Sequence, residues 1–429
     1  MTPPFTQRAG GRDWQGGLLL GRRPPDSHGA FGYGRAERTP EMAGSLITYG
    51  GKAPLLTIAP TDAGKTSGPV VSNARTYPGP LICLDVKGEV YRLSADHRRR
   101  MGQKVEVLDL RDGKPSGSLN PLDMAQLLGN DRCVISRSLA AEIVARPGHA
   151  ARDFFWIDWS ETMLTAGISW LLHHQEDDAR LSKLFDLYMS SDSTYNIAVL
   201  LDTVRPMNRA SQANWSAYLA LSDRETRPSV LGSVNAYLRL FESELIRRLT
   251  DTTSVDLEAI LTGEPVSLYI IVPPYRIGGF APILRLWLTG LMNLLTMRET
   301  VPEWPTLMMV DEAAQLGRVD SFVTASTLMR GYGLKLWTFW QSASQLEIYG
   351  SDGRTLIDNA GVVQVFGVRN YRAAAEAAAL LGGLSAEQIL AMGREEQLLM
   401  IEGGAPQRCR QIRYYSDELL VGRNPPRPA

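Results

Sequence analysis

Two kinds of hydrophobic pattern alternate along the chain. Between residues 50 and 121, short apolar runs lie among turn residues and a helical stretch, as in "LLTI", "LICLDV" and "VEVLDL". Runs without a polar residue at every second position are typical of strands buried on both faces of a parallel sheet. Similar runs return after residue 262 as "VSLYIIV", "TLMMVDE", "LKLWTFWQ" and "GVVQVFGV", between helical stretches. The pattern predicts one α/β core made from two separate parts of the chain.

The middle of the chain has a different pattern. From about residue 123 to 261, long amphipathic stretches such as "SLAAEIVA" and "LGSVNAYLRLFESELIRRLT" dominate, which predicts helices. An all-α domain is therefore inserted into the α/β core. The expected division is an extended Gly/Pro/Arg-rich arm at 1–45, the core at 46–122 and 262–429, and the all-α domain at 123–261.

Composition adds limits to this picture. With 44% hydrophobic and 21% charged residues among 429, the chain is of ordinary globular type. The net charge of −1 does not indicate a nucleic-acid surface, and the basic cluster "DHRRR" (96–100) is either a nucleic-acid contact or a solvated helix end. Three distant cysteines favour a reducing compartment. Charges interrupt the two most apolar stretches, "FFWIDWSETMLTAGISWLL" and "APILRLWLTGLMNLLTM", which predicts core helices and not membrane spans.

The segment "APTDAGKTS" follows the first strand-like run directly. A phosphate loop, GxxxxGK[ST], offers backbone N–H groups at a helix start, a lysine for the β/γ-phosphates and a hydroxyl for magnesium. Ala59 replaces the first glycine, and Asp62 at the apex is expected to point outward, because a carboxylate would repel phosphate. The alternative is a helix cap after a tight turn. The predicted nucleotide contacts are Thr61, Asp62, Ala63, Gly64, Lys65, Thr66 and Ser67.

A second set of candidates follows later strand-like runs. Asp311 and Glu312 end "TLMMVDE". The Asp311 carboxylate suits binding of magnesium together with the Thr66 hydroxyl, and the Glu312 carboxylate suits activation of an attacking water. The alternative is a strand that runs into a helix capped by Asp311. Gln341, after "LKLWTFW", suits either a γ-phosphate sensor or a strand-end hydrogen bond. Arg330 is either a finger that reaches a neighbouring subunit's site or a surface arginine. The catalytic candidates are therefore Glu312, Arg330 and Gln341.

The stretch "LDVKGEV" places Asp85, Lys87 and Glu89 just past another strand. Ligands of open α/β sheets bind at this edge, so Asp85 and Lys87 join the candidate nucleotide contacts. By itself the stretch also fits a charged turn.

The ordered set of these motifs resembles a known family. "APTDAGKTSG", "LDVKGEVYRLSADHRRRMGQKVEVLDL", "SLNPLD", "MMVDEAAQLG", "LMRGYGLKLWTFWQSASQLEIYG" and "QIRYYSDELL" occur between about residues 50 and 420. Together they are similar to the coupling-protein ATPases of type IV secretion and bacterial conjugation. The resemblance implies a RecA-like P-loop NTPase core with a mainly parallel sheet and an inserted all-α domain. It also implies a hexameric ring that binds ATP and Mg²⁺ at subunit interfaces.

The resemblance also implies a role for each matching residue. Lys65 and Thr66 would bind phosphate and magnesium, and Asp311 would hold the metal. Glu312 would be the catalytic base, Arg330 the finger that acts in trans, and Gln341 the sensor. Asp85, Lys87 and Glu89 match the DxKGE element of the family, whose task stays open. The all-α domain would help to recognise relaxase or effector proteins.

The start of the chain departs from the family pattern. Typical members begin with transmembrane helices, whereas the arm is expected here, so we expect either a separate membrane partner at the channel or a cytosolic motor. The expected place is the cytoplasm, or the cytoplasmic face of the inner membrane after recruitment. The expected function is ATP-driven transfer of DNA or nucleoprotein toward a type IV secretion channel. The alternatives are a nucleotide-assembled recruitment ring for protein effectors and a cytosolic FtsK/HerA-like DNA translocase.

Overall fold

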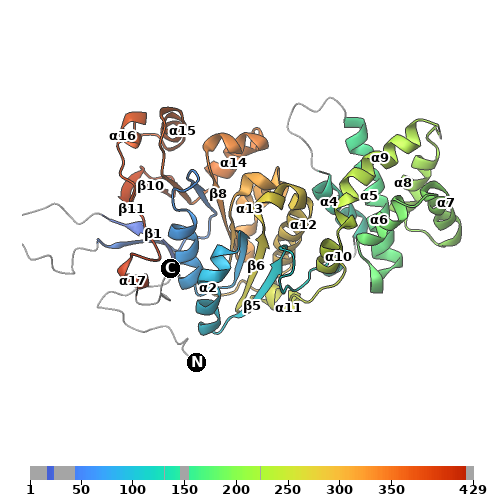
Figure 1. Ribbon diagram of the computed structural model, residues 1–429, viewed down its shortest axis with the longest axis horizontal. Helices are drawn as coiled ribbons and strands as arrows, with labels where there is room; N and C mark the ends of the chain where they lie inside the picture. Colours follow the sequence, from blue (N-terminus) through green and yellow to red (C-terminus); the bar gives the residue numbers. More distant parts are fainter. Residues whose placement is uncertain (1–16, 24–43, 130, 145–153, 223, 422–429) are drawn as a thin grey trace, which may run out of the picture.

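An eleven-stranded sheet forms the centre of the α/β core (Figure 1). The computed structural model describes residues 17–23, 44–129, 131–144, 154–222 and 224–421. The strand order is β2-β1-β11-β10-β9-β3-β8-β7-β4-β6-β5. Neighbours from β9 to β5 are parallel, and the remaining pairs are antiparallel. The strands are β1 (Leu18–Arg22), β2 (Leu46–Tyr49), β3 (Leu55–Ile58), β4 (Leu81–Val86), β5 (Lys104–Asp109), β6 (Val266–Val272), β7 (Thr306–Val310), β8 (Leu334–Trp340), β9 (Val362–Phe366), β10 (Glu396–Ile401) and β11 (Gln407–Arg410).

The register of the parallel strands brings their carboxyl ends to one edge of the sheet. Ile58 of β3 lies opposite Trp340 of β8, the last residue of that strand. Val310, the last residue of β7, lies opposite Leu84 of β4. The residues that follow β3, β7 and β8 therefore leave the sheet side by side, and Asp85 of β4 lies at the same level.

Helices cover both faces of the sheet. Alternate strand residues divide between two apolar clusters: Leu55 packs in one with α1 and α2, and Leu56 packs in the other with α12, α13 and α14. Central strands buried on both faces explain the continuous apolar runs. The helices are α1 (Val71–Thr76), α2 (Glu89–Arg100), α12 (Ile277–Thr296), α13 (Asp320–Thr327), α14 (Asp352–Asp358), α15 (Tyr371–Leu381), α16 (Ala386–Leu390) and α17 (Glu418–Val421).

Two sequence expectations concern these covering helices. In the described part of the chain, one helical stretch, 274–296, is long and apolar enough to cross a membrane, yet 78% of its most apolar window is buried within the fold. This agrees with the core helix predicted there. The basic cluster at the end of α2 is not one surface, because Arg98 is fully buried and donates to Ser267 Oγ at 2.7 Å. A nucleic-acid contact by the whole cluster is therefore excluded.

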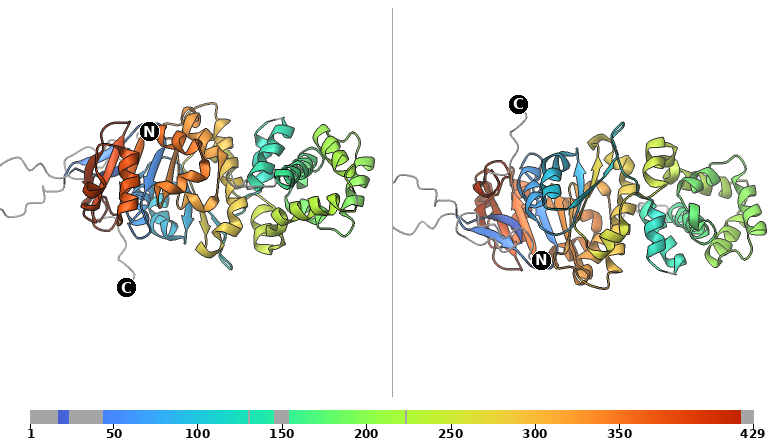
Figure 2. Two further views of the ribbon diagram at one scale, coloured as in Figure 1. Left: turned by 90° about the horizontal axis from the view of Figure 1, so that it is seen from above. Right: turned by 90° about the horizontal axis from the view of Figure 1, so that it is seen from below.

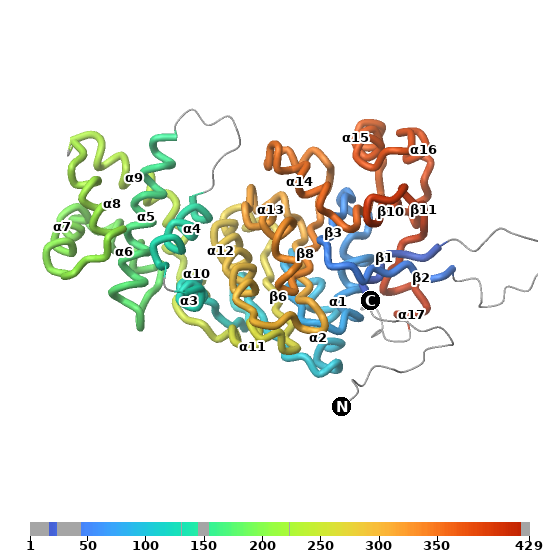
Figure 3. The backbone as a smooth tube through the Cα atoms, turned by 180° about the vertical axis from the view of Figure 1, so that it is seen from behind, coloured from blue at the N-terminus to red at the C-terminus, as the bar shows by residue number. Residues whose placement is uncertain are grey.

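The inserted segment forms a helical lobe at one end of the molecule, beyond α12 (Figure 2). No strand is described between β5 and β6. The long helix α5 lies at the centre of this lobe, against α4, α8 and α9. The backbone trace in Figure 3 shows α3 and α4 next to α12, where the lobe joins the core. The helices are α3 (Pro121–Leu127), α4 (Arg132–Ile143), α5 (Phe154–His174), α6 (Ser182–Tyr188), α7 (Ser193–Thr203), α8 (Arg209–Leu219), α9 (Thr226–Leu238), α10 (Glu244–Thr250) and α11 (Leu257–Thr262).

The prediction of an extended arm at 1–45 is wrong for residues 18–22, because these residues form strand β1 between β2 and β11. Asn73 of α1 fixes this strand, since its side chain accepts from Leu19 N at 2.7 Å and donates to Leu19 O at 2.9 Å. Arg22 adds a double hydrogen bond to Asp417. The strand was missed because its flanking Gly/Pro/Arg-rich sequence hides a short apolar run. Residues 1–16 and 24–43 of the expected arm lie outside the described residues.

Candidate nucleotide-binding site

The loop after β3 has the conformation that its glycine predicts. Gly64 has a φ of 97° and Asp62 a φ of 60°, both in the left-handed region, where glycine carries no steric penalty. Asp62 is exposed, and Thr66 begins a short helical turn, η2 (Thr66–Val70), that leads into α1. Ala59 is absent from the positive-φ residues, is fully buried, and donates its N–H to Trp340 O at 2.9 Å. This position therefore needs no glycine, which explains the departure from the GxxxxGK[ST] pattern.

Lys65 lies at the centre of the site. Its side chain is 6% exposed, and its Nζ donates to Ala59 O at 2.7 Å. The same Nζ lies 3.5 Å from Glu312 Oε1. Glu312 Oε2 accepts a hydrogen bond from Gln341 Nε2 at 2.7 Å. The structure thus brings Lys65, Glu312 and Gln341 together from the ends of three neighbouring strands.

Glu312 has a φ of 52°, a conformation that costs energy for a residue other than glycine. The turn aims its carboxylate at Lys65 and Gln341 and starts η6 (Ala313–Leu316). Backbone strain of this kind is common where a side chain must be held for function.

Two buried carboxyl groups lie beside this trio. Burial, together with the negative charge of Glu312, raises the pKa of Asp311 to about 7, although the positive charge of Lys65 opposes the shift. Burial likewise raises the pKa of Asp85 to about 6, although Tyr91 N donates to its Oδ2 at 2.8 Å. The other oxygen of Asp85, Oδ1, is buried without a hydrogen-bond partner. Both groups would gain from a cation that stabilises their charged forms.

These oxygens fit magnesium. Mg²⁺ in nucleotide sites is typically held by one or two carboxylates and a hydroxyl, with phosphate oxygens and waters as its other ligands. Among the described residues, no three His, Cys, Asp or Glu side chains gather to hold a metal by themselves. Asp311 and the Thr66 hydroxyl would hold the ion, and the negative charge of Asp85 also raises the pKa of Asp311.

Other predicted residues lie outside this cluster. Lys87 is exposed in a turn with a φ of 91°, and its described hydrogen bonds are those of its backbone, to Val272 and Arg111. Arg330 is exposed in η7 (Met329–Tyr332), before the amino end of β8, whereas Gln341 follows the carboxyl end. Thr61 is exposed on the loop. The structure therefore does not bring Lys87 or Arg330 to the loop of the same chain.

Arg413 is a site residue that the sequence pattern missed. Its guanidinium donates to Ser67 Oγ at 3.4 Å and to Ala63 O at 3.5 Å, across 346 and 350 residues of sequence. Its Nε donates to Glu395 Oε2 at 3.2 Å. The residue lies in "QIRYYSDELL", and no local pattern in that segment indicates contact with a loop so distant in sequence.

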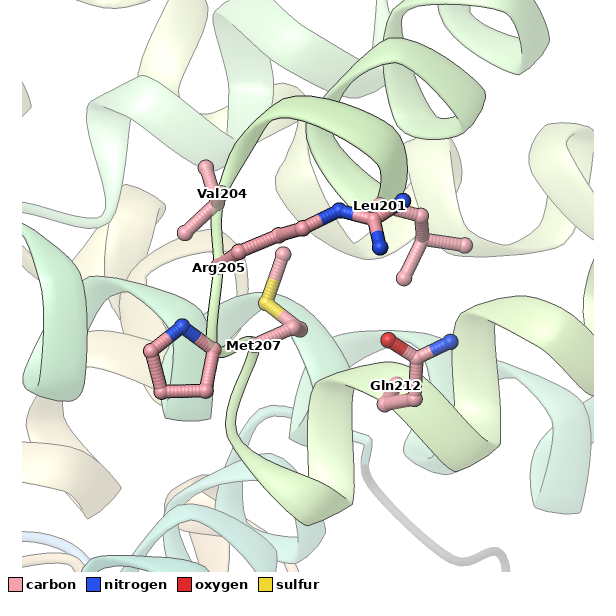
Figure 4. A pocket seen from close by; sticks show the side chains of 6 residues that line it. Leu201, Val204, Arg205, Met207 and Gln212 are labelled. Atoms are coloured by element: carbon pink, nitrogen blue, oxygen red, sulfur yellow. The ribbon is translucent and has the colours of Figure 1, made fainter.

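Two cavities are candidates for a ligand. One, of about 490 Å³, adjoins the phosphate loop at Asp62 and Ala63. The other, of about 590 Å³, lies in the helical lobe between α7 and α8 (Figure 4). The second is lined by Leu201, Val204, Arg205, Pro206, Met207 and Gln212. Its one cation, Arg205, already pairs with Asp202 at 2.8 Å, so the groups that suit a nucleotide are those at the loop.

Comparison with known proteins gives the family. Residues 33–385 match the family model described as type IV secretory system conjugative DNA transfer. The chain belongs to this family. Two relatives from the wider family are "Protein VirD4" of Rhizobium radiobacter, 27% identical over 425 residues, and "Conjugal transfer protein TraG" of Escherichia coli, 24% identical over 406 residues. Each match covers 89% of this chain, but only 60% and 63% of the relative, so the chain spans about three fifths of their length.

Two solved structures of other proteins share the fold of this chain. The plasmid coupling protein TrwB in complex with ADP and Mg²⁺ matches with a TM-score of 0.65 and 13% identity, over 84% of this chain and 85% of that chain. VirB4 of Thermoanaerobacter pseudethanolicus matches with a TM-score of 0.52 and 15% identity, over 96% and 100%. The predicted RecA-like P-loop fold with an all-α domain is therefore confirmed, as is the predicted family.

Proposed function

We propose that this chain is the motor part of a coupling protein, which hydrolyses ATP to move DNA or nucleoprotein toward a type IV secretion channel. The contact of Lys65 and Gln341 with Glu312 carries the proposal. A phosphate-binding lysine, a carboxylate and an amide at one sheet edge form the set that nucleotide hydrolysis requires. Family membership and the ADP–Mg²⁺ complex of TrwB support ATP and Mg²⁺ as the ligands.

Each residue at the edge has a step to perform. The loop N–H groups and Lys65 would bind the phosphates, and Thr66 and Asp311 would hold Mg²⁺. The ion, when bound, offsets negative charge on the β- and γ-phosphates. Lys65 exchanges Glu312 for phosphate, which leaves the Glu312 carboxylate to accept a proton from the attacking water. Gln341, already bonded to Glu312, orients that water.

The proposal extends to the assembly. Arg330 is exposed and precedes the amino end of β8, away from the loop of its own chain, so it serves a neighbouring copy's γ-phosphate in a hexameric ring. DNA passes through the ring by electrostatic, weakly sequence-dependent contacts. The helical lobe at 123–261 recruits relaxase or effector proteins, and a membrane partner holds the ring at the cytoplasmic face of the inner membrane.

The test is the ATPase rate of the purified chain at low salt, alone and with single-stranded or duplex DNA. We expect DNA to raise the rate, and the Glu312→Gln variant to bind ATP but hydrolyse it at least about 100-fold more slowly, since general bases contribute roughly this much. Glu258→Gln, on the exposed side of α11, removes the same charge elsewhere and should match the wild type. ATP hydrolysis that no DNA accelerates would contradict the DNA motor and favour the recruitment ring.

A further inference from the structure

Arg413 lies on the phosphate loop without a strong partner. Its side chain is 11% exposed, yet its bonds to Glu395, Ser67 and Ala63 measure 3.2, 3.4 and 3.5 Å, and its bond to the carbonyl of Arg394 measures 3.4 Å. Charge-assisted hydrogen bonds of arginine are usually about 2.7–2.9 Å long. A nearly buried guanidinium with only long bonds is available for a better anionic ligand.

The backbone holds Arg413 in this place independently of its side chain. Tyr414 N donates to Ser67 O at 3.0 Å, and Gln411 N donates to Glu395 O at 2.7 Å. Four residues after Arg413, Asp417 accepts from Arg22 at 2.6 and 2.8 Å. The segment is therefore anchored on both sides of Arg413, and its guanidinium is free to change partners while the main chain stays on the loop.

The cavity of about 490 Å³ opens on the same side of the loop. It is lined by Arg413, Arg394, Arg369 and Asp62 among others, and neither Lys65 nor Glu312 belongs to its wall. The catalytic cluster and the cavity are therefore formed by different residues, and Asp62 and Ala63 of the loop belong to the cavity. A nucleotide whose γ-phosphate lies at Glu312 has room for its nucleoside end on the Arg413 side.

We infer that Arg413 binds the α- or β-phosphate of a nucleotide on its own chain, as a second cation beside Lys65. The inference rests on the proposed nucleotide binding. Loop N–H groups cradle the α- and β-phosphates, and Arg413 touches that loop at Ala63 and Ser67, not at the γ-phosphate groups. On binding, the guanidinium exchanges Glu395 for phosphate oxygens. Because ATP and ADP share these two phosphates, Arg413 does not discriminate between them.

The test measures the affinity of the full chain for fluorescent ATP and ADP analogues with Mg²⁺. Arg413→Gln should weaken both by about tenfold, which corresponds to about 1.4 kcal/mol, and should raise KM for ATP far more than it lowers kcat. Arg408→Gln is the matched control, because Arg408 pairs with Glu396 on the same hairpin and does not contact the loop. Its affinities should equal those of the wild type.

A third variant separates a ligand role from a structural one. Glu395→Gln removes the competing carboxylate, so it should raise the affinity for both nucleotides, which loss of a purely structural link would not do. The melting temperature of Arg413→Gln without nucleotide will show whether that variant is folded. If it is unfolded, the affinity of Glu395→Gln decides between a ligand role and a structural role for Arg413. Lys65→Ala tests the proposed function itself: equal binding by wild type and Lys65→Ala would overturn nucleotide binding at the loop. If Lys65→Ala loses binding but Arg413→Gln and Glu395→Gln bind like the wild type, only the role of Arg413 is overturned.

Discussion

Glu142 offers a quantitative test of how the helical lobe is joined to the core. It lies near the end of α4, is 8% exposed, and its backbone carbonyl accepts a hydrogen bond from Arg285 Nε of α12 at 2.8 Å. Burial raises its pKa to about 7, despite the opposing effects of Thr289 and Arg285. A pKa raised from its ordinary value of about 4.5 to about 7 corresponds to about 3 kcal/mol of unfolding free energy.

The direction of the effect follows from proton binding. Folded Glu142 holds its proton more tightly than the unfolded chain does, so its contribution to stability is complete below about pH 4.5 and is lost as the pH rises through about 7. Glu142→Gln does not titrate. Between pH 5 and 8, the unfolding free energy of this variant relative to the wild type should therefore rise by about 2–3 kcal/mol.

The assay is urea denaturation of both proteins at pH 5 and pH 8. Other buried carboxyl groups, Asp311 and Asp85 among them, affect wild type and variant alike and cancel in the difference. Glu258→Gln, which changes an exposed glutamate, should show no comparable pH dependence. A difference between Glu142→Gln and wild type that stays constant from pH 5 to 8 would refute a raised pKa at the joint.

Three further changes probe the loop, the first strand and the sensor. Gly64→Ala should abolish nucleotide binding in a fluorescence titration, since a φ of 97° is strained for alanine and the added Cβ would overlap the Arg413 guanidinium; unchanged affinity would contradict this. Arg22→Ala should lower the urea unfolding free energy by about 2 kcal/mol through loss of its double bond to Asp417, and Asp417→Ala should add little to it; additive losses would count against the pair. Gln341→Ala should lower kcat by about tenfold or more with nucleotide affinity kept, and a change in affinity alone would exclude its role with water.

Strands with local apolar runs could be read from the sequence. The runs "LICLDV" and "VSLYIIV" match β4 and β6 residue for residue, because buried parallel strands need apolar side chains on both faces. Strand β1 could not be predicted from the sequence, because its place between β2 and β11 depends on hydrogen bonds to distant residues such as Asn73. The antiparallel hairpin of β10 and β11 was missed for a different reason, because "QRCR" contains a single apolar residue, Cys409, and so lacks the apolar run of a buried strand.

The residues of the candidate site that could be predicted are those at or after the carboxyl ends of strands. Lys65, Asp311, Glu312 and Gln341 each follow or end a strand, and parallel strands align their carboxyl ends. Lys87 also follows a strand, but its left-handed backbone conformation leaves the residue exposed. The sequence alone does not indicate that conformation. A contact across some 350 residues leaves no periodic or spacing signal, and that is why the place of a C-terminal arginine on the loop required the structure.

Movement along DNA is the most direct test of the central claim. The measurement is the ATP-dependent displacement of streptavidin from the biotinylated end of a DNA strand, with wild type and Glu312→Gln side by side. The account predicts displacement with ATP and Mg²⁺ by the wild type, and none with a non-hydrolysable ATP analogue or with Glu312→Gln. Displacement by Glu312→Gln at the wild-type rate, or none by a wild type that hydrolyses ATP in the presence of DNA, would contradict it.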